Sequence, residues 1–485
     1  MAPAPGANAT NGDAGKAGTN GVRVFYSSRY QSESIAKKFR EDGTIRSITF
    51  AQKADPCIGL LGKAMSVFKR DVGMTNVAVT VQPNLNLLAG PGANEKEPNG
   101  NGTGASPKDE NLELGHRGQA KSLYLATDAA VLSRVDPDTL EPIGQVHQSA
   151  LHPDLKGPTS AAHGKRDPVT GDFFNYNLEF GFTPTYRVFQ IVAATGEVKI
   201  LATLKGGLAK AGYIHSFFIT ENYVVLCVPS LRHQKGGAMI PLKGNILEAM
   251  AFEDVPCAWF VIDRKGDKGV VKEFQTPPGF FFHSTNAWEE GDELVCEALW
   301  FDNADILYSF YYEVLANREG KAAEFWANRE LGVRLARHRF PMKSGSSGSG
   351  SGDLVQPEFQ IPGPHAGELP TYNTRLATRR HRFVYGVSSR GLSTMFDAIV
   401  KTDTDERSAV LWRAPRGHTP GEPIFVPRPE GVEEDDGVLL SVVLDGAKGM
   451  SYLLCLDAAT MEVVGRAECE FAVGFGFHGR LVGAQ

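Results

Sequence analysis

Short segments that combine β-branched and aromatic residues recur along the whole chain, and this recurrence is the strongest constraint on its fold. Gly, Asn, Asp and Pro separate the segments, which alternate apolar and polar residues as strands do. They include VRVFYSSRY, NVAVTVQPNL, KSLYLATDAAVLSRVD, DFFNYNLEF, YVVLCVPSL, ELVCEALWF, HRFVYGVSS and VLLSVVLDG. One hairpin phrase occurs in two variants, at Val135–Gly144 and Leu456–Gly465, as strand, Asp-led turn and strand. Short antiparallel strands in units of roughly 50 residues predict an all-β fold, a β-propeller rather than a sandwich.

The composition agrees with a large, turn-rich core. The chain has 53 glycines and 28 prolines among 485 residues, and 42% of its residues are hydrophobic. Length alone suggests about three domains, but propellers break that rule, so we predict one propeller domain over residues 22–485. Residues 1–21 are predicted to be a disordered low-complexity tail, with flexible insertions at about 90–119 and at 344–352. Helix is sparse, and one is predicted at Asn303–Ala316.

Charge and cysteine usage exclude several classes of protein. The formal net charge is −6, and no Lys/Arg cluster interleaves with aromatic residues, so we expect no nucleic-acid partner. The six cysteines are scattered without a CxxC pair, which is typical of reduced thiols in an intracellular protein. No apolar run approaches the ~18 residues of a spanning helix, and the N-terminus lacks a signal-peptide core. We therefore expect a cytoplasmic protein.

Four of the twelve histidines stand in unusual surroundings. His163, His215, His283 and His478 each lie among small or apolar residues and beside a β-like segment. The inner strand of each propeller blade faces the central axis, so histidines at matching places would converge there. Taken singly, each is more typical of a satisfied core histidine than of a metal ligand. The others are expected to be solvated or to cap loops: His116, His147, His152, His233, His338, His365, His381 and His418.

Longer phrases around these four histidines resemble the carotenoid cleavage oxygenases. The phrases are AAHGKRDPVTGD, IHSFFITENYVVL, HSTNAWEE, GEPIFVPRP and FHGRLV, and the match runs in the family's order from about Arg23 to Val482. Two further stretches, Met74–Leu85 and Leu369–Val387, resemble the fungal torulene-cleaving branch. Because the phrases are long and spread over the chain, the resemblance is specific.

This resemblance implies a seven-bladed β-propeller, with a few helices and loops capping one face and a non-haem Fe(II) on its axis. The iron ligands that it implies are His163, His215, His283 and His478. It also implies three carboxylates that accept the other ring N–H of these ligands and fix their tautomer. Glu368 and Glu422 match two of these places, and Asp128 stands at the third. Because aspartate is one methylene shorter than glutamate, its hydrogen bond is expected to be either direct after a small shift or water-mediated.

The reaction implied by the resemblance is cleavage of a conjugated C=C bond of a carotenoid such as torulene. O2 is the co-substrate, apocarotenal aldehydes are the products, and no protein nucleophile is needed. The alternatives are a stilbene- or apocarotenoid-cleaving oxygenase and a catalytically inactive propeller scaffold. The last arises because the family's GT-x-R-x-GP and FDGDGM-like phrases do not precede Val22. The first blade is therefore expected to lack its opening strands.

Two segments are candidates for handling an apolar substrate. Cys57–Arg70 is amphipathic with basic flanks, which fits either an interfacial helix on a membrane or lipid droplet or a core-packed helix. Phe280, Phe281 and Phe282 come directly before an implied iron ligand, and they either line a substrate tunnel or fill the core. We expect a carotenoid and O2 as partners, with peripheral membrane association.

Overall fold

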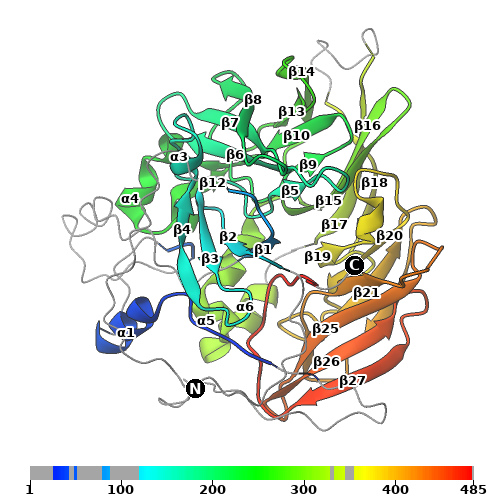
Figure 1. Cartoon of the computed structure of the whole chain (residues 1–485). Helices are drawn as coiled ribbons and strands as arrows, with labels where there is room; N and C mark the ends of the chain where they lie inside the picture. The colour runs from blue at the N-terminus through cyan, green and yellow to red at the C-terminus, as the bar shows by residue number, and fades with distance from the viewer. Residues whose placement is uncertain are drawn as a thin grey trace.

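The computed structural model describes residues 24, 26–42, 49–51, 79–87, 120–327, 332–343 and 354–482. The predicted tail at 1–21, the helix at 57–70 and the insertions at 90–119 and 344–352 lie outside the described residues. Strands dominate the described ranges and the helices are few and short, as the sequence pattern predicts (Figure 1).

Six antiparallel sheets of four or five strands follow one another in chain order. The first sheet holds β1 (Thr80–Pro83), β2 (Leu123–Ala126), β3 (Val131–Val135) and β4 (Pro142–His147). The second holds β5 (Lys165–Arg166), β6 (Phe173–Glu179), β7 (Thr185–Ile191) and β8 (Val198–Lys205). The third holds β9 (Phe218–Ile219), β10 (Tyr223–Val228), β13 (Cys257–Asp263) and β14 (Val270–Thr276).

The other three sheets come from the second half of the chain. The fourth holds β15 (Phe280–Glu290), β16 (Glu293–Phe301), β17 (Arg334–Pro341) and β18 (Pro357–Pro362). The fifth holds β19 (Glu368–Thr371), β20 (Phe383–Ser388), β21 (Ala398–Asp403) and β22 (Ser408–Arg413). The sixth holds β23 (His418–Pro420), β24 (Ile424–Pro427), β25 (Gly437–Asp445), β26 (Met450–Asp457) and β27 (Val463–Cys469). A separate ribbon pairs β11 (Leu231–His233) with β12 (Met250–Phe252).

Short helices lie in the connections between strands. They are α1 (Glu33–Asp42), α3 (Gln148–Leu151), α4 (Met239–Lys243), α5 (Tyr312–Leu315) and α6 (Lys321–Ala327), with 3-10 turns η1 (Gln234–Gly237), η2 (Leu247–Ala249), η3 (Asp305–Phe310), η4 (Arg318–Gly320) and η5 (Thr374–Leu376). Within the described ranges, none has the length and apolar character needed to cross a bilayer. The prediction of one helix at Asn303–Ala316 is wrong, because Tyr311 is extended and separates η3 from α5. Leu307 and Phe310 pack on the core beside the break, so the chain follows the core surface instead of one helix axis.

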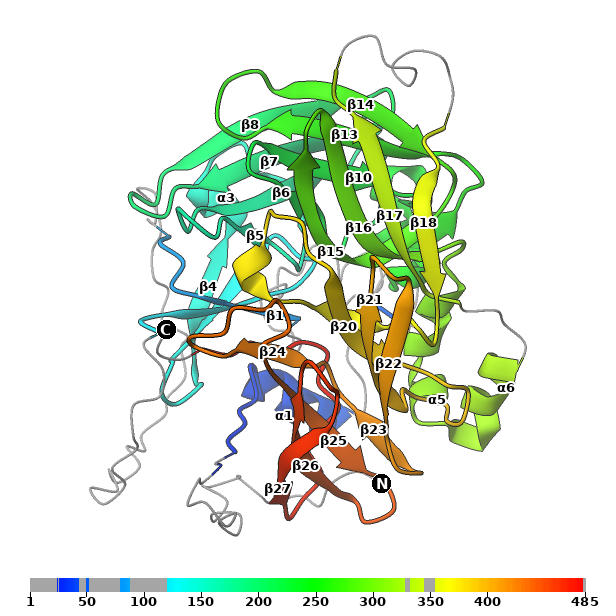
Figure 2. The same cartoon turned by 90° about the vertical axis from the view of Figure 1, so that its right-hand side faces the viewer.

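Apolar cores join each sheet to the next. Representative buried residues are Phe189 between the first and second sheets, Tyr186 between the second and third, Trp259 between the third and fourth, Leu335 between the fourth and fifth, and Leu439 between the fifth and sixth. In Figures 1 and 2 the sheets accordingly follow one another around the molecule, from the cyan first sheet to the orange and red sixth sheet. The arrangement is all-β and propeller-like.

The described residues form six blades, so the prediction of seven is wrong. Every described strand belongs to one of the six sheets or to the small ribbon, so no described strand is left to form a seventh blade. Val22–Tyr30 has the sequence pattern of a strand, but its described residues pair with no other strand. Instead, Tyr26 packs its ring on Phe471, with the centroids 5.2 Å apart. Within the described residues, no apolar core joins the sixth sheet to the first.

The repeated hairpin phrase forms the same turn in both places. Asp136 follows β3, and its Oδ1 accepts the backbone N–H groups of the two residues at positions 138 and 139 at 2.9 and 2.8 Å. Asp457 ends β26 and accepts two N–H groups in the same way at 3.0 and 2.9 Å. Each turn ends in a residue with positive φ, Leu140 at 61° and Met461 at 63°. The aspartate offsets the missing ladder hydrogen bonds, and so the sequence phrase specifies the turn.

The fourth and fifth sheets are also joined by a buried charged network. Glu297 accepts a hydrogen bond from Arg337 at 2.6 Å and lies 2.5 Å from Nε2 of His381. Burial acts to raise the pKa of Glu297, but His381 and Arg337 outweigh it, and the pKa is lowered. The prediction that His381 is solvated is therefore wrong, because the ring is buried against its carboxylate partner.

His233 is also buried, so its predicted exposure is wrong, and the same holds for His338. Its charged sequence neighbours suggest the surface, but in β17 the side chain points into the core, where Trp259, Trp300 and Phe340 surround it with centroids 5.2–6.1 Å away. Burial lowers the pKa of His338 from 6.5 to about 4. The folded state therefore holds this ring neutral at pH values where the unfolded chain protonates it.

We predict that His338 makes the fold sensitive to acid. A lowered folded-state pKa means that stability is fully present above pH 6.5 and is lost as the pH falls toward 4, by about 3 kcal/mol. Chemical denaturation across this range should show that His338→Phe, which keeps an aromatic ring in the core, loses correspondingly less stability than the wild type. The exposed His365 provides the control, since His365→Ala should keep the wild-type pH dependence. If the free energy of unfolding fell with pH equally for His338→Phe and the wild type, the prediction would be contradicted.

Candidate metal centre

The four histidines singled out in the sequence come together in space. One ring nitrogen from each lies within 4.8 Å of those of the other three. His163 lies just before β5, His215 just before β9, His283 within β15, and His478 in the segment after β27. The closest pair of ring centroids, His163 and His478, is 4.3 Å apart. Residues separated by most of the chain thus form one cluster.

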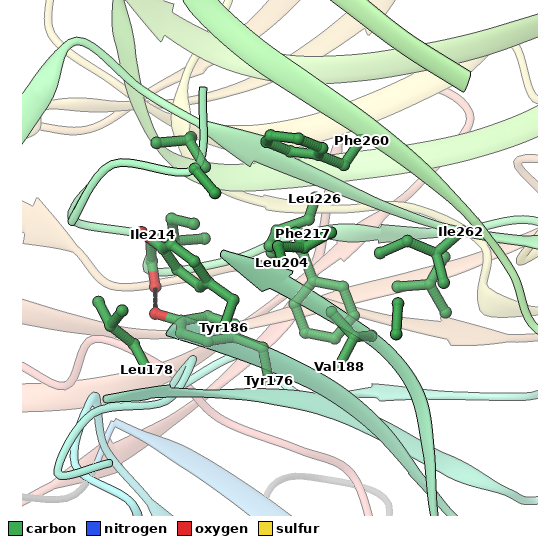
Figure 3. Packing of buried hydrophobic residues seen from close by; sticks show 14 of the residues in the cluster. Tyr176, Leu178, Tyr186, Val188, Leu204, Ile214, Phe217, Leu226, Phe260 and Ile262 are labelled. Carbon is green, nitrogen blue, oxygen red and sulfur yellow. Dashed lines mark hydrogen bonds between the residues drawn. The ribbon is translucent and has the colours of Figure 1, made fainter. Parts of the chain in front are cut away.

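The core between the second and third sheets positions two of these histidines. Ala161 precedes His163 by two residues, and Ile214 directly precedes His215; both are buried in this core. Figure 3 shows Ile214 among the packed side chains, with the Tyr176 hydroxyl donating to its carbonyl at 2.7 Å. Fully burying an aliphatic side chain contributes about 1.5–3 kcal/mol, so the apolar neighbours anchor the segments that carry the histidines.

Hydrogen bonds join three of the histidine-bearing segments directly. The backbone N–H of His163 donates to the carbonyl of His215 at 3.2 Å. Ser284, next to His283, donates two hydrogen bonds: its N–H donates to Oγ of Ser216 at 2.7 Å, and its hydroxyl donates to the carbonyl of residue 217 at 2.8 Å. The relative positions of these histidines are therefore set by backbone as well as by side-chain contacts.

His478 reaches the cluster by a different route. The segment after β27 returns across the sixth sheet, where the N–H at position 473 donates to the Ser451 hydroxyl at 3.0 Å. Farther along, Phe475 packs on Phe396, with the ring centroids 6.3 Å apart. The N–H of Gly479 then donates to Oε2 of Glu422 at 2.6 Å. Glu422 thus holds both the ring of His478 and the backbone beside it.

Three carboxylates face the Nδ1 atoms of three of the histidines. The Nδ1–carboxylate distances are 2.9 Å from His215 to both oxygens of Asp128, 2.5 Å from His283 to Glu368, and 2.8 Å from His478 to Glu422. The contact of Asp128 is direct, which is one of the two arrangements left open by the sequence. An Nδ1–H that donates to a carboxylate leaves the Nε2 lone pair for a metal ion. Among the described residues, no carboxylate contacts the ring of His163.

The electrostatics of the cluster favour neutral imidazoles. Burial and the neighbouring His478 and His215 rings hold the pKa of His163 well below its usual value. Burial and His478 act on His283 in the same direction. Neutral imidazole is the form that binds metals. Burial raises the pKa of Glu368 to about 8, and positive charge at the cluster would favour the ionised carboxylate.

The donor set fits a transition-metal ion. Nε2 of His163 is buried and has no hydrogen-bond partner among the described residues, which costs about 1–3 kcal/mol unless a ligand satisfies it. Nε2 of His283 lies 3.1 Å from Nε2 of His478. With each Nδ1 donating to a carboxylate, these two atoms present lone pairs to each other, an arrangement that a cation between them would relieve. Imidazole ligands suit Fe, Cu, Zn or Ni rather than Mg or Ca.

Tyr213 is a residue of the site that sequence reasoning missed. Its hydroxyl donates to Oδ2 of Asp128 at 2.7 Å. Burial and the nearby carboxylate raise the pKa of Tyr213 well above its usual value, so the phenol stays protonated and donates. The sequence could have pointed to Tyr213, because it precedes His215 by two residues in a β-like segment, and residues two apart in a strand lie on the same face.

The three consecutive phenylalanines do not share one environment. Phe282 lies beside the histidines, with its ring centroid 5.7 Å from that of His215 and 6.0 Å from that of His283. Phe280 stacks on the Tyr213 ring, and both belong to the apolar cluster at this end of the fourth sheet. Phe281 instead fills the core between the third and fourth sheets. Phe281 therefore lies away from the four histidines, and Phe282 is the phenylalanine nearest to them.

Comparisons with known proteins agree along the length of the chain. The sequence profile described as retinal pigment epithelial membrane protein matches residues 16–483. A carotenoid dioxygenase of Neurospora crassa is 45% identical over 492 residues, covering 95% of this chain and 79% of its own. A torulene dioxygenase of Fusarium fujikuroi is 41% identical over 486 residues, covering 94% and 80%.

Solved structures show the same fold at much lower sequence identity. A variant of Synechocystis apocarotenoid oxygenase matches with a TM-score of 0.67 at 18% identity, over 95% of this chain and 84% of that chain. The cobalt-substituted form of that oxygenase matches with a TM-score of 0.65 at 18% identity, over 94% and 83%. The profile match and the two fungal relatives establish the family: the chain belongs to the carotenoid cleavage oxygenases, the oxygenase family of the retinal pigment epithelial membrane protein.

Proposed function

We propose that the protein is an Fe(II)-dependent dioxygenase that cleaves a conjugated C=C bond of a torulene-like carotenoid. The observation that carries this proposal is the cluster of four histidines, three of which have a carboxylate on the ring nitrogen that faces away from the cluster. The metal ligands in the proposal are His163, His215, His283 and His478. The resemblance to torulene dioxygenase supports the choice of substrate.

The reaction balances without a protein nucleophile. Bound ferrous iron would supply the activation of O2; the C=C bond breaks, and each carbon receives one oxygen atom, so two aldehydes form. The protein residues orient the metal ligands and set the charge around the metal site. Asp128, Glu368 and Glu422 hold the ring tautomers, and four neutral imidazoles leave the positive charge of the metal undiminished. The apolar cluster around Phe282 would exclude water from a bound polyene.

Access to an apolar substrate requires contact with a lipid phase. We propose peripheral association of a cytoplasmic protein with a membrane or lipid droplet, for which the amphipathic segment Cys57–Arg70 is the candidate from sequence. That segment lies outside the described residues.

The first prediction from the proposed function concerns the metal. His215→Ala should remove one of four ligands and abolish iron binding, measured as iron per protein after Fe(II) reconstitution. Asp128→Asn should retain the iron and lower activity by roughly 10–100-fold, because the tautomer of His215 is no longer fixed. His365→Ala, at an exposed histidine, serves as the control and should match the wild type. An iron-loaded, active His215→Ala protein would show that the ligand assignment is wrong.

The second prediction concerns the products. Iron-loaded protein incubated with torulene, β-carotene and resveratrol should form an apocarotenal pair from torulene, identified by mass spectrometry of both halves. Cleavage of resveratrol alone would identify a stilbene oxygenase and refute the proposed substrate. Protein that binds iron and cleaves none of the three would support an inactive scaffold.

The third prediction separates the roles of two adjacent phenylalanines. Phe282→Leu should raise KM for the carotenoid by roughly tenfold, because it removes an apolar contact beside the histidines. Phe281→Leu should lower the free energy of unfolding by about 1 kcal/mol and leave KM unchanged, because this ring packs between two sheets. The pair has equal changes in volume, so steady-state kinetics and denaturation curves compare directly. A higher KM for Phe281→Leu alone would reverse the assignment.

A further inference from the structure

We propose that Tyr213 is a positioning residue for the metal centre, which acts on His215 through Asp128; this role rests on the function proposed above. The three side chains form one chain of hydrogen bonds. The Tyr213 hydroxyl lies 2.7 Å from Oδ2 of Asp128, and both oxygens of Asp128 lie 2.9 Å from Nδ1 of His215. The hydroxyl is 3.4 Å from Nδ1 itself, so its hydrogen bond is to the carboxylate.

The short side chain of Asp128 explains why such support is needed. A carboxylate whose two oxygens are equally far from one N–H can rotate and share that proton in several ways. Here each oxygen is held by a further donor: Tyr213 on Oδ2, and the backbone N–H of Ala162 on Oδ1 at 3.1 Å. These two donors fix the plane of the carboxylate, and the carboxylate in turn fixes the plane of the His215 ring.

The other two carboxylates are supported differently. Glu422 receives the backbone N–H of Gly479 on its second oxygen at 2.6 Å. Oε2 of Glu368 receives the N–H of Leu369 at 3.1 Å, and its Oε1 has no partner among the described residues. Asp128 is therefore the member of the trio that depends on a side-chain hydroxyl, at the place where the family resemblance implies a longer glutamate.

The ring of Tyr213 is held firmly enough to perform this role. It is 6% exposed, and it packs on Phe50 and Phe280 with centroids 5.8 and 6.1 Å away. Its backbone N–H donates to the carbonyl of Leu231 at 3.0 Å. Because neighbouring aromatic rings pack on the Tyr213 ring and its backbone is hydrogen-bonded, the hydroxyl is held pointing toward Asp128.

The test measures how fast the protein releases ferrous iron to a strong chelator, which is independent of catalysis. Tyr213→Phe should release iron roughly tenfold faster than the wild type. Tyr385→Phe is the matched control, since it removes a buried hydroxyl that donates to a backbone carbonyl at 3.0 Å between the fifth and sixth sheets. This control should release iron at the wild-type rate. The visible spectrum of the Co(II)-loaded protein should change for Tyr213→Phe and stay unchanged for Tyr385→Phe.

A double-mutant cycle shows whether Tyr213 acts through Asp128. If it does, adding Tyr213→Phe to Asp128→Asn should leave the release rate of Asp128→Asn unchanged. Multiplying effects would overturn the proposal, as would a wild-type rate and spectrum for Tyr213→Phe. A wild-type protein that binds no ferrous ion would refute the proposed function and, with it, this role. The two failures can be told apart, because the wild type still binds iron if only the role of Tyr213 is wrong.

Discussion

Bringing four imidazole rings to one point is the constraint on which the rest of this structure depends. Each ring must be neutral to offer a lone pair, and it must be turned so that this lone pair faces the others. Burial keeps His163 and His283 neutral. Carboxylates on Nδ1 of His215, His283 and His478 set the orientation, because they accept the ring N–H and leave Nε2 free to bind. Burying carboxylates beside neutral rings is costly without a compensating charge, so the arrangement favours a bound cation.

The sheets serve this cluster by anchoring the short segments that carry it. Apolar neighbours such as Ile214 are buried between consecutive sheets, and backbone hydrogen bonds such as that between His163 and His215 join one segment to the next. His478 is held instead by the return of the segment after β27 and by Glu422. Three positions therefore depend on how consecutive sheets pack, and the fourth depends on where one returning segment lies.

Local features of this fold could be predicted from sequence, and long-range ones could not. The four histidines stand in long phrases, and the turns at Asp136 and Asp457 depend on donors only two or three residues away. The number of sheets depends on partners far along the chain, and Val22–Tyr30 has the pattern of a strand, although those of its residues that the structure describes pair with no other strand. His338 shows the same limit, because its burial is decided by aromatic residues on two other strands and not by the arginines beside it.

Tyr213 joins the apolar wall to the candidate metal centre. Its ring is part of the cluster that contains Phe280, while its hydroxyl supports Asp128. Hydrogen bonds weaken steeply as their geometry departs from the optimum, so a small displacement of this ring changes the support given to the carboxylate. A glutamate in place of Asp128 would reach the histidine with an extra methylene and depend less on a neighbour. The shorter aspartate therefore makes the orientation of His215 sensitive to the packing of aromatic residues that do not contact it.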